Sequence, residues 1–207
     1  MRALVVDDEL ATRTLLVGLA RAQGLEVTAA SDGEEAWKLF EGRPFPLVLT
    51  DWIMPKVNGL ELTRQIRATS AAQEYTYVLV ITTLSAREHT LTAFEAGADD
   101  MLVKPPDAAQ IAARIGVARR FLDAHARRAE QAYLGSLEQL QTELGHEHVA
   151  LTGNLAALAS HYRGRGAHAR ARAFLRREID VLAAAEGERD PRVLALREEL
   201  RALSAAR

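Results

Sequence analysis

The stretch VLTDWIMPKVNG, residues 48–59, contains the first clue to the fold. Val48 and Leu49 belong to an apolar run with the length and composition of a buried strand. Asp51 stands where that strand is expected to reach solvent. A carboxylate at a strand end could simply cap the next helix, so its role depends on which other polar residues reach the same edge.

Residues 1–120 alternate between short apolar runs and helix-like stretches. The apolar runs, mostly rich in Val, Leu, Ile or Thr, are residues 3–6, 25–30, 47–50, 77–82 and 101–103. The helix-like stretches are residues 9–23, 33–41, 59–69, 87–96 and a last one that starts near Asp107. Five strands alternating with five helices predict an α/β fold, a doubly wound five-stranded parallel sheet with helices on both faces.

Residues that commonly begin or end helices stand at the expected helix boundaries. Asp32, Asn58 and Ser85 precede the second, third and fourth helices, where a side-chain oxygen can accept bonds from free backbone N–H groups. Gly24 and Gly97 stand where helices should stop, because glycine readily adopts the left-handed backbone conformation found there. These positions support the assignment of the elements.

In open parallel sheets, functional groups gather at the carboxyl ends of the strands. Here those ends carry Asp7, Asp8, Asp51, Thr82 and Lys104. Three carboxylates held together at neutral pH repel one another unless a cation lies between them, and Mg²⁺ suits oxygen ligands. A metal, an ammonium group and a hydroxyl around one carboxylate suit a phosphoryl group bound to it. We therefore predict that Asp51 is phosphorylated.

Four motifs at this edge closely resemble the receiver domain of bacterial two-component response regulators, the chemotaxis regulators among them. The motifs are VVDDE (5–9), LTDWIMPKVNG (49–59), LVITT (79–83) and VKPP (103–106). The resemblance covers about residues 1–120 and implies a flavodoxin-like fold. It also implies that a histidine kinase donates the phosphoryl group in a Mg²⁺-dependent reaction.

Carried over position by position, the resemblance implies a role for several residues. Asp51 becomes the phosphoacceptor, Thr82 the switch hydroxyl and Lys104 the cation that binds the phosphate. The implied Mg²⁺ ligands are Asp8 and Asp51, with Asp7 acting through water and the backbone carbonyl of Ile53 completing the set. The resemblance further implies a cis peptide bond between Lys104 and Pro105.

Three positions need separate attention. Met101 occupies the place on the fifth strand where many receivers carry a Tyr or Phe rotamer switch, so coupling from Thr82 must use a flexible apolar side chain. Thr83 competes with Thr82 for the switch role, and the spacing to Lys104 favours Thr82. Ile53, two residues after the phosphoacceptor, is bulky and apolar, so we expect it to hinder attacking water and to lengthen the lifetime of the acyl phosphate.

No strand pattern appears in the second half of the chain. Apolar or small residues recur about every 3.7 residues over positions 111–144, close to the helical period. The spacing predicts a helix over 107–145, with Gly116 and Gly135 as candidate breaks. This helix would carry the fifth receiver helix into residues 121–207, which we predict to form an all-α helical-hairpin output domain.

Residues 121–207 contain a weak internal repeat. Gly145 and Gly187 lie 42 residues apart, and each follows apolar residues and precedes a polar turn and a Leu- and Ala-rich helix. The residues spaced as in a tetratricopeptide repeat are Leu158, Tyr162, Gly166, Ala171 and Leu175. We predict a tetratricopeptide-repeat-like domain that binds a downstream protein. The alternative is a generic helical bundle or a dimerisation stalk, and a homodimer is left open.

Residues 149–177 contain six arginines and no acidic residue. The arginines are Arg163, Arg165, Arg170, Arg172, Arg176 and Arg177. They could bind an acidic partner or nucleic-acid phosphates, but we favour a solvated, Arg-rich helical face over nucleic-acid binding. His161 and His168 raise a second alternative, a phosphorelay intermediate that passes phosphate to a histidine. Gly164 stands where such a module usually carries a basic residue three positions after its histidine.

The composition narrows the classes of protein to which this chain could belong. The chain has no cysteine, which excludes disulfides, and its net charge is −2. No segment approaches the roughly 20 apolar residues that span a bilayer, so we expect a cytoplasmic protein without membrane association. We find no phosphate-binding loop or nucleophile elbow for an output enzyme. The expectation is a non-enzymatic response regulator with a receiver domain (1–120) and an output domain (121–207).

Overall fold

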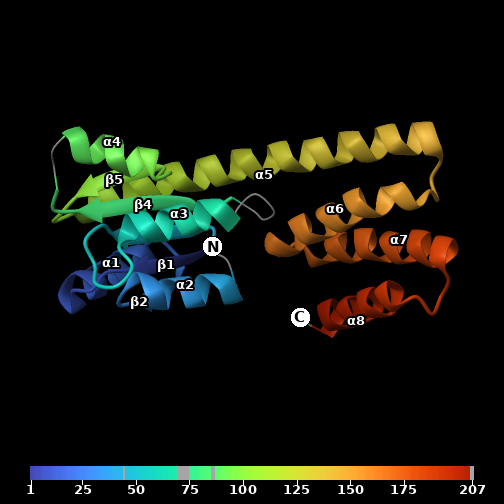
Figure 1. The fold of residues 1–207 in the computed structure, drawn as a ribbon, viewed down its shortest axis with the longest axis horizontal. Helices are drawn as coiled ribbons and strands as arrows, with labels where there is room; N and C mark the ends of the chain where they lie inside the picture. Colours follow the sequence, from blue (N-terminus) through green and yellow to red (C-terminus); the bar gives the residue numbers. More distant parts are fainter. Residues whose placement is uncertain (44, 70–74, 85–86, 206–207) are drawn as a thin grey trace. The chain divides into compact units, whose positions relative to one another are not determined.

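In the computed structural model, the chain forms two compact units, Met1–Ala124 and His125–Arg207 (Figure 1). The structure describes residues 1–43, 45–69, 75–84 and 87–205. The division between the units falls within one long helix, four residues beyond the boundary that we predict from the sequence. No helix among the described residues is both long enough and apolar enough to cross a membrane.

The first unit contains the predicted five-stranded parallel sheet. Its strands are β1 (Arg2–Val6), β2 (Glu26–Ala30), β3 (Leu47–Asp51), β4 (Tyr77–Thr82) and β5 (Asp100–Val103). They lie in the order β2-β1-β3-β4-β5, and every neighbouring pair is parallel. The strand order reverses at β1, so the carboxyl ends of β1 and β3 meet at the point where such sheets place their functional groups.

Helices cover both faces of this sheet (Figure 1). They are α1 (Leu10–Ala22), α2 (Gly33–Gly42), α3 (Gly59–Thr69), α4 (Arg87–Glu95) and α5 (Ala108–Leu144). Alternate residues of a strand point to opposite faces. Leu4 and Val6 of β1 therefore pack in the cluster that includes residues of α2, α3 and α4, whereas Ala3 and Val5 pack with residues of α1 and α5. Burial on both faces explains why these strands read as unbroken apolar runs.

The helix boundaries follow the predicted capping residues where the structure describes them. The Asp32 side chain accepts a hydrogen bond from the Glu35 backbone N–H at 2.9 Å. Asn58 caps α3 by accepting bonds from the backbone N–H groups of Leu60 and Glu61 at 3.0 and 2.9 Å. The predicted cap at Ser85 lies outside the described residues. Both Gly24 and Gly97 have positive φ, as expected of residues that end helices.

Helix α5 runs without interruption from Ala108 to Leu144, through both glycines that the sequence marks as candidate breaks. Gly116 and Gly135 each lower the stability of the helix by about 1 kcal/mol relative to alanine. Burial of one end of the helix in a hydrophobic core easily offsets this loss. Ile111 and Ile115 are buried against the sheet and supply that anchor. The sequence leaves open whether this helix is continuous, and in the structure neither candidate break interrupts it.

The second unit is entirely helical over the residues that are described. After α5 come a short 3₁₀ turn, η2 (Val149–Leu151), and the helices α6 (Thr152–Gly164), α7 (His168–Glu186) and α8 (Pro191–Ala205). Gly145, Gly166 and Gly187 all have positive φ and separate these helices. Two buried clusters join α6 to α7 and α7 to α8, and the rings of Tyr162 and Phe174 stack 5.5 Å apart in the first.

Candidate functional site

The ends of β1, β3 and β5 bring two carboxylates and one ammonium group together. Asp7 follows β1 and is fully buried, and Asp51 ends β3 and is 7% exposed. Lys104 follows β5, and its Nζ lies 2.7 Å from Asp7 Oδ2 and 2.6 Å from Asp51 Oδ2. One cation therefore bridges two acids that are far apart in the sequence.

The Asp51 carboxylate is fixed by the backbone that follows it. Its Oδ1 accepts hydrogen bonds from the backbone N–H groups of Trp52 and Ile53, at 2.6 and 3.4 Å. The chain then folds back, so that the Gly59 N–H donates to the Trp52 carbonyl oxygen at 2.9 Å. A Cβ on Gly59 would lie only 1.9 Å from the Asp51 carbonyl oxygen. Glycine at this position permits the close packing that holds the Asp51 loop in place.

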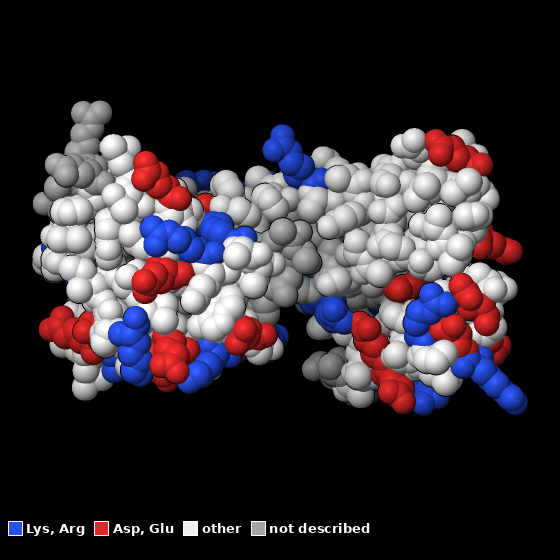
Figure 2. Space-filling model, in the orientation of Figure 1, with Lys and Arg blue, Asp and Glu red and all other residues white. Residues whose placement is uncertain are grey.

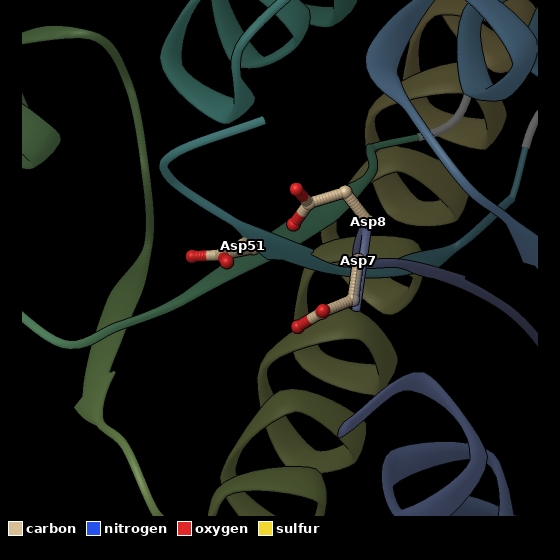
Figure 3. A group of neighbouring side chains, drawn as sticks. All are labelled: Asp7, Asp8 and Asp51. Atoms are coloured by element: carbon tan, nitrogen blue, oxygen red, sulfur yellow. The ribbon is translucent and has the colours of Figure 1, made fainter. Parts of the chain in front are cut away.

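Asp8 completes an acidic group at this edge (Figure 3). One carboxylate oxygen from each of Asp7, Asp8 and Asp51 lies within 4.8 Å of the others, and Asp8 alone is exposed. Figure 3 shows the three side chains gathered around one small space at the ends of β1 and β3. Carboxylate oxygens at this spacing, one of them open to solvent, fit Mg²⁺, which prefers few protein ligands and keeps several waters.

The site gathers acidic groups where access of solvent is restricted, and this shifts the pKa values of Asp7 and Lys104. Burial raises the pKa of Asp7, although the bonds from Lys104 and from the Glu9 backbone act in the opposite direction. Burial alone would lower the pKa of Lys104, but its hydrogen bonds to Asp51 and Asp7 outweigh that and raise it. Lys104 is therefore held as a charged ammonium, as binding a phosphoryl group requires.

Thr82 and Thr83 are placed differently. Thr82 ends β4 and is fully buried, and its Oγ1 accepts a hydrogen bond from the Leu84 backbone N–H at 3.2 Å. Thr83 is exposed. The backbone of Lys104 donates to the Thr82 carbonyl oxygen at 2.8 Å, so these two residues are neighbours across β4 and β5. The peptide bond between Lys104 and Pro105 is cis, as predicted.

The remaining positions singled out near the site lie around it. The Ile53 side chain is 56% exposed, close to the carboxylate that its backbone N–H contacts. Met101 is half-buried and packs against the core cluster that includes residues of α2, α3 and α4. The ring of His89 lies edge-on against Trp52, with ring centroids 5.6 Å apart. Only the packing of α4 on the β3–α3 loop reveals that contact.

Most of the arginines in the second unit contact other protein groups. Arg163 pairs with Glu199, Arg170 lies 3.7 Å from Glu130, and Arg172 donates to the Leu203 carbonyl oxygen at 3.4 Å. With its amide suitably oriented, Gln141 accepts from Arg177. On the face drawn in Figure 2, Lys and Arg are interspersed with Asp and Glu over both units. These contacts favour the reading of the arginines as part of the helical fold.

The two histidines considered for a phosphorelay are poorly placed for it. His161 is only 5% exposed, and burial lowers the pKa of its imidazole. His168 is half-buried, and its Nδ1 is buried without a hydrogen-bond partner in the described part of the chain. A histidine that exchanges phosphate with another protein must present its ring nitrogen to that protein. The ring of His161 does not do so, and Nδ1 of His168 does not either.

Comparisons with known proteins agree with the geometry of the first unit. The family model for the response regulator receiver domain matches residues 3–116. The chain is 36% identical over 107 residues to chemotaxis protein CheY1 of Helicobacter pylori. The matched region covers 51% of this chain and 86% of that protein. It is 34% identical over 122 residues to the probable transcriptional regulator ycf27 of Porphyridium aerugineum.

The match to ycf27 covers 59% of this chain but only about half, 49%, of that relative's length. The solved structure of the chemotaxis response regulator CheY4 of Vibrio cholerae superposes with a TM-score of 0.53 at 27% identity, covering 56% of this chain and 97% of that chain. Receiver domains are phosphorylated by histidine kinases, and the acidic group of the first unit is typical of their Mg²⁺ site. Through residues 3–116, the chain belongs to the response regulator receiver family.

Proposed function

We propose that Asp51 accepts a phosphoryl group from a histidine kinase in a Mg²⁺-dependent reaction. The observation that carries this proposal is the pair of contacts from Lys104 Nζ, 2.6 Å from Asp51 and 2.7 Å from Asp7. They hold a cation beside a carboxylate that is 7% exposed and next to Asp8, which faces solvent. A carboxylate so placed can be reached by a phosphohistidine while its surroundings neutralise the charge that arrives.

In the proposed reaction, a carboxylate oxygen of Asp51 attacks phosphorus. The new P–O bond forms as the P–N bond of the kinase phosphohistidine breaks, and the released imidazole takes up a proton. The ion would be held by Asp8 and Asp51, by Asp7 through water and by the Ile53 carbonyl, and when bound it supplies positive charge to the phosphoryl oxygens. Lys104 supplies a second positive charge, fixed in place by Asp7.

Thr82 is proposed as the switch residue. Its hydroxyl is buried and uses its oxygen to accept from Leu84, so its proton remains available to donate to a phosphoryl oxygen. That new bond would draw Thr82 inward and repack the face formed by β4, α4 and β5, on which Met101 is half-buried. Flexible Met101 can adjust to this movement by changing rotamers, in place of the Tyr or Phe of many receivers.

For the second unit we propose a protein-binding output of the tetratricopeptide-repeat type. The α6–α7 hairpin supports this, since Leu158, Tyr162, Ala171 and Leu175 are all buried and Gly166 makes the turn with φ of 72°. The continuous α5 helix gives a covalent connection from the receiver to this hairpin. The intramolecular ion pairs of the arginines and the burial of His161 speak against nucleic-acid binding and phosphorelay as the main output.

The test of phosphorylation is labelling with radioactive acetyl phosphate in the presence and absence of Mg²⁺. We expect label on the wild-type chain only with Mg²⁺, and none on Asp51→Asn. The control is Asp107→Asn, which changes an acid to an amide at the cap of α5, where the two residues are equally good. Label that persists in Asp51→Asn, or that needs no metal, would refute the proposal. Affinity capture with and without beryllofluoride then tests whether the receiver controls binding by the second unit.

A further inference from the structure

A hollow of about 350 Å³ lies among three helices of the second unit. Thr152 begins α6 on one side, Glu178 and Leu182 come from α7, and the α8 residues are Arg192, Ala195 and Leu196. Its volume is near the lower end of the roughly 300–1,000 Å³ of ligand-binding pockets. The leucine and alanine side chains make its walls largely apolar, so its one acidic side chain stands out.

Glu178 is only 7% exposed, although it lines this hollow. Among the described residues, it has no hydrogen bond and no ion pair. A carboxylate nine-tenths buried without a positive partner is unfavourable, because burial removes its hydration and nothing replaces it. Such a group is stabilised when a cation enters the hollow beside it.

The protein's own charges do not satisfy Glu178. Glu199 of α8 lies close enough to repel it and pairs with Arg163. Arg192 lines the same hollow but is bound to Asp190 at 3.0 Å and to Glu186 at 3.3 Å. Burial and, to a lesser extent, Glu199 raise the pKa of Glu178 to about 7. The carboxylate is therefore partly protonated near neutral pH and can lose its proton when a cation arrives.

We propose that this hollow binds the side chain of an arginine or lysine from a protein partner, with the cationic head on Glu178 and the aliphatic stem along Leu182 and Leu196. The combination of one buried acid and apolar walls fits a side chain that has an apolar stem and a charged tip. The proposal names the chemistry of the partner for the protein-binding output proposed above, and it rests on that output.

The test uses the full-length chain and two peptides, acetyl-Ala-Leu-Arg-Leu-Ala-amide and the same peptide with citrulline in place of arginine. Citrulline keeps the shape of arginine without its charge. Isothermal titration calorimetry measures both affinities with and without beryllofluoride. We expect the arginine peptide to bind at least about tenfold more tightly than the citrulline peptide in at least one of these states. Repeating the titration in buffers of different ionisation enthalpy should show proton release on binding.

The variant Glu178→Gln should bind both peptides equally, at the level of the citrulline peptide. Glu188→Gln, an exposed acid of the same unit that pairs with Arg197, is the matched control and should keep the preference. Equal binding of the two peptides by the wild-type chain, binding of neither, or a preference that survives in Glu178→Gln would overturn the proposal. Because affinity capture tests the protein-binding output and Asp51 labelling tests phosphorylation, failure here leaves both of those proposals standing.

Discussion

Replacing Asp8 by Asn should make the metal-free protein more stable and the Mg²⁺-bound protein less stable than the wild type. Asp8 has one carboxylate oxygen within 4.8 Å of oxygens of Asp7 and Asp51. Those two acids and Lys104, which bridges them, together leave one net negative charge beside Asp8. Without metal, Asp8 is therefore repelled by its neighbours.

The size of the effect follows from this geometry. One net charge at 4.8 Å costs about 1 kcal/mol in a water-like dielectric and about 3 kcal/mol at an effective dielectric of about 20. Asp8 is exposed and precedes the N-terminus of α1, where a negative charge stabilises a helix by at most about 1 kcal/mol. The net expectation for Asp8→Asn without metal is a gain of about 1–2 kcal/mol in the free energy of unfolding.

Mg²⁺ should reverse the order of stability, so that the wild type becomes more stable than Asp8→Asn. At a concentration one hundred times its dissociation constant, a ligand stabilises the folded state by about 2.7 kcal/mol. Asp8→Asn should lose most of that gain, because a neutral amide oxygen replaces a charged carboxylate ligand. Urea unfolding followed by tryptophan fluorescence reports on the receiver, because both tryptophans, Trp37 and Trp52, lie in the first unit. The exposed Glu41→Gln control should shift stability by less than about 0.5 kcal/mol. An Asp8→Asn protein that is less stable in EDTA, or that gains as much from Mg²⁺ as the wild type, would refute the electrostatic reasoning.

Two further predictions concern one residue in each unit. Ile53→Asn should speed the loss of phosphate from Asp51 by roughly tenfold, because a polar side chain at this exposed position admits and orients water that the isoleucine hinders. Chemical quenching of labelled protein measures the rate, and Ile53→Leu is the control that keeps the bulk of the side chain. An unchanged rate in the Asn variant contradicts the role of Ile53. Burial raises the pKa of Glu178 from 4.5 to about 7 in the folded state. Its contribution to stability is therefore complete below about pH 4 and is lost as the pH rises through about 7, by about 3 kcal/mol in all. Hydrogen exchange of the α7 amides should show that loss in the wild type and not in Glu178→Gln; the same slope in both proteins would assign it to another group.

Much of the receiver could be predicted from local sequence because its local preferences agree with the fold. Strands that are buried on both faces must be apolar throughout, so their positions were predicted to within a residue or two, as at β3 and β4. The helix caps at Asp32 and Asn58 could be predicted for a similar reason, since a capping side chain bonds to backbone only two or three residues away. The ends of α5 could also be predicted. Whether its two glycines would interrupt the helix could not, because their low helix propensity is outweighed by the burial of Ile111 and Ile115, which depends on tertiary packing.

The sequence by itself determined that Asp7, Asp8, Asp51, Thr82 and Lys104 would share one edge, because the alternation of strands and helices fixes where parallel strands end. Only the tertiary structure decided which groups touch: that Lys104 bridges Asp7 and Asp51, and that His89 meets Trp52. It also decided that arginines of the second unit, such as Arg163, pair with acids of the same unit, whereas Glu178 has no such partner among the described residues. The reason is that charge pairing and burial depend on distances between residues remote in the chain, and a local pattern carries no information about those distances.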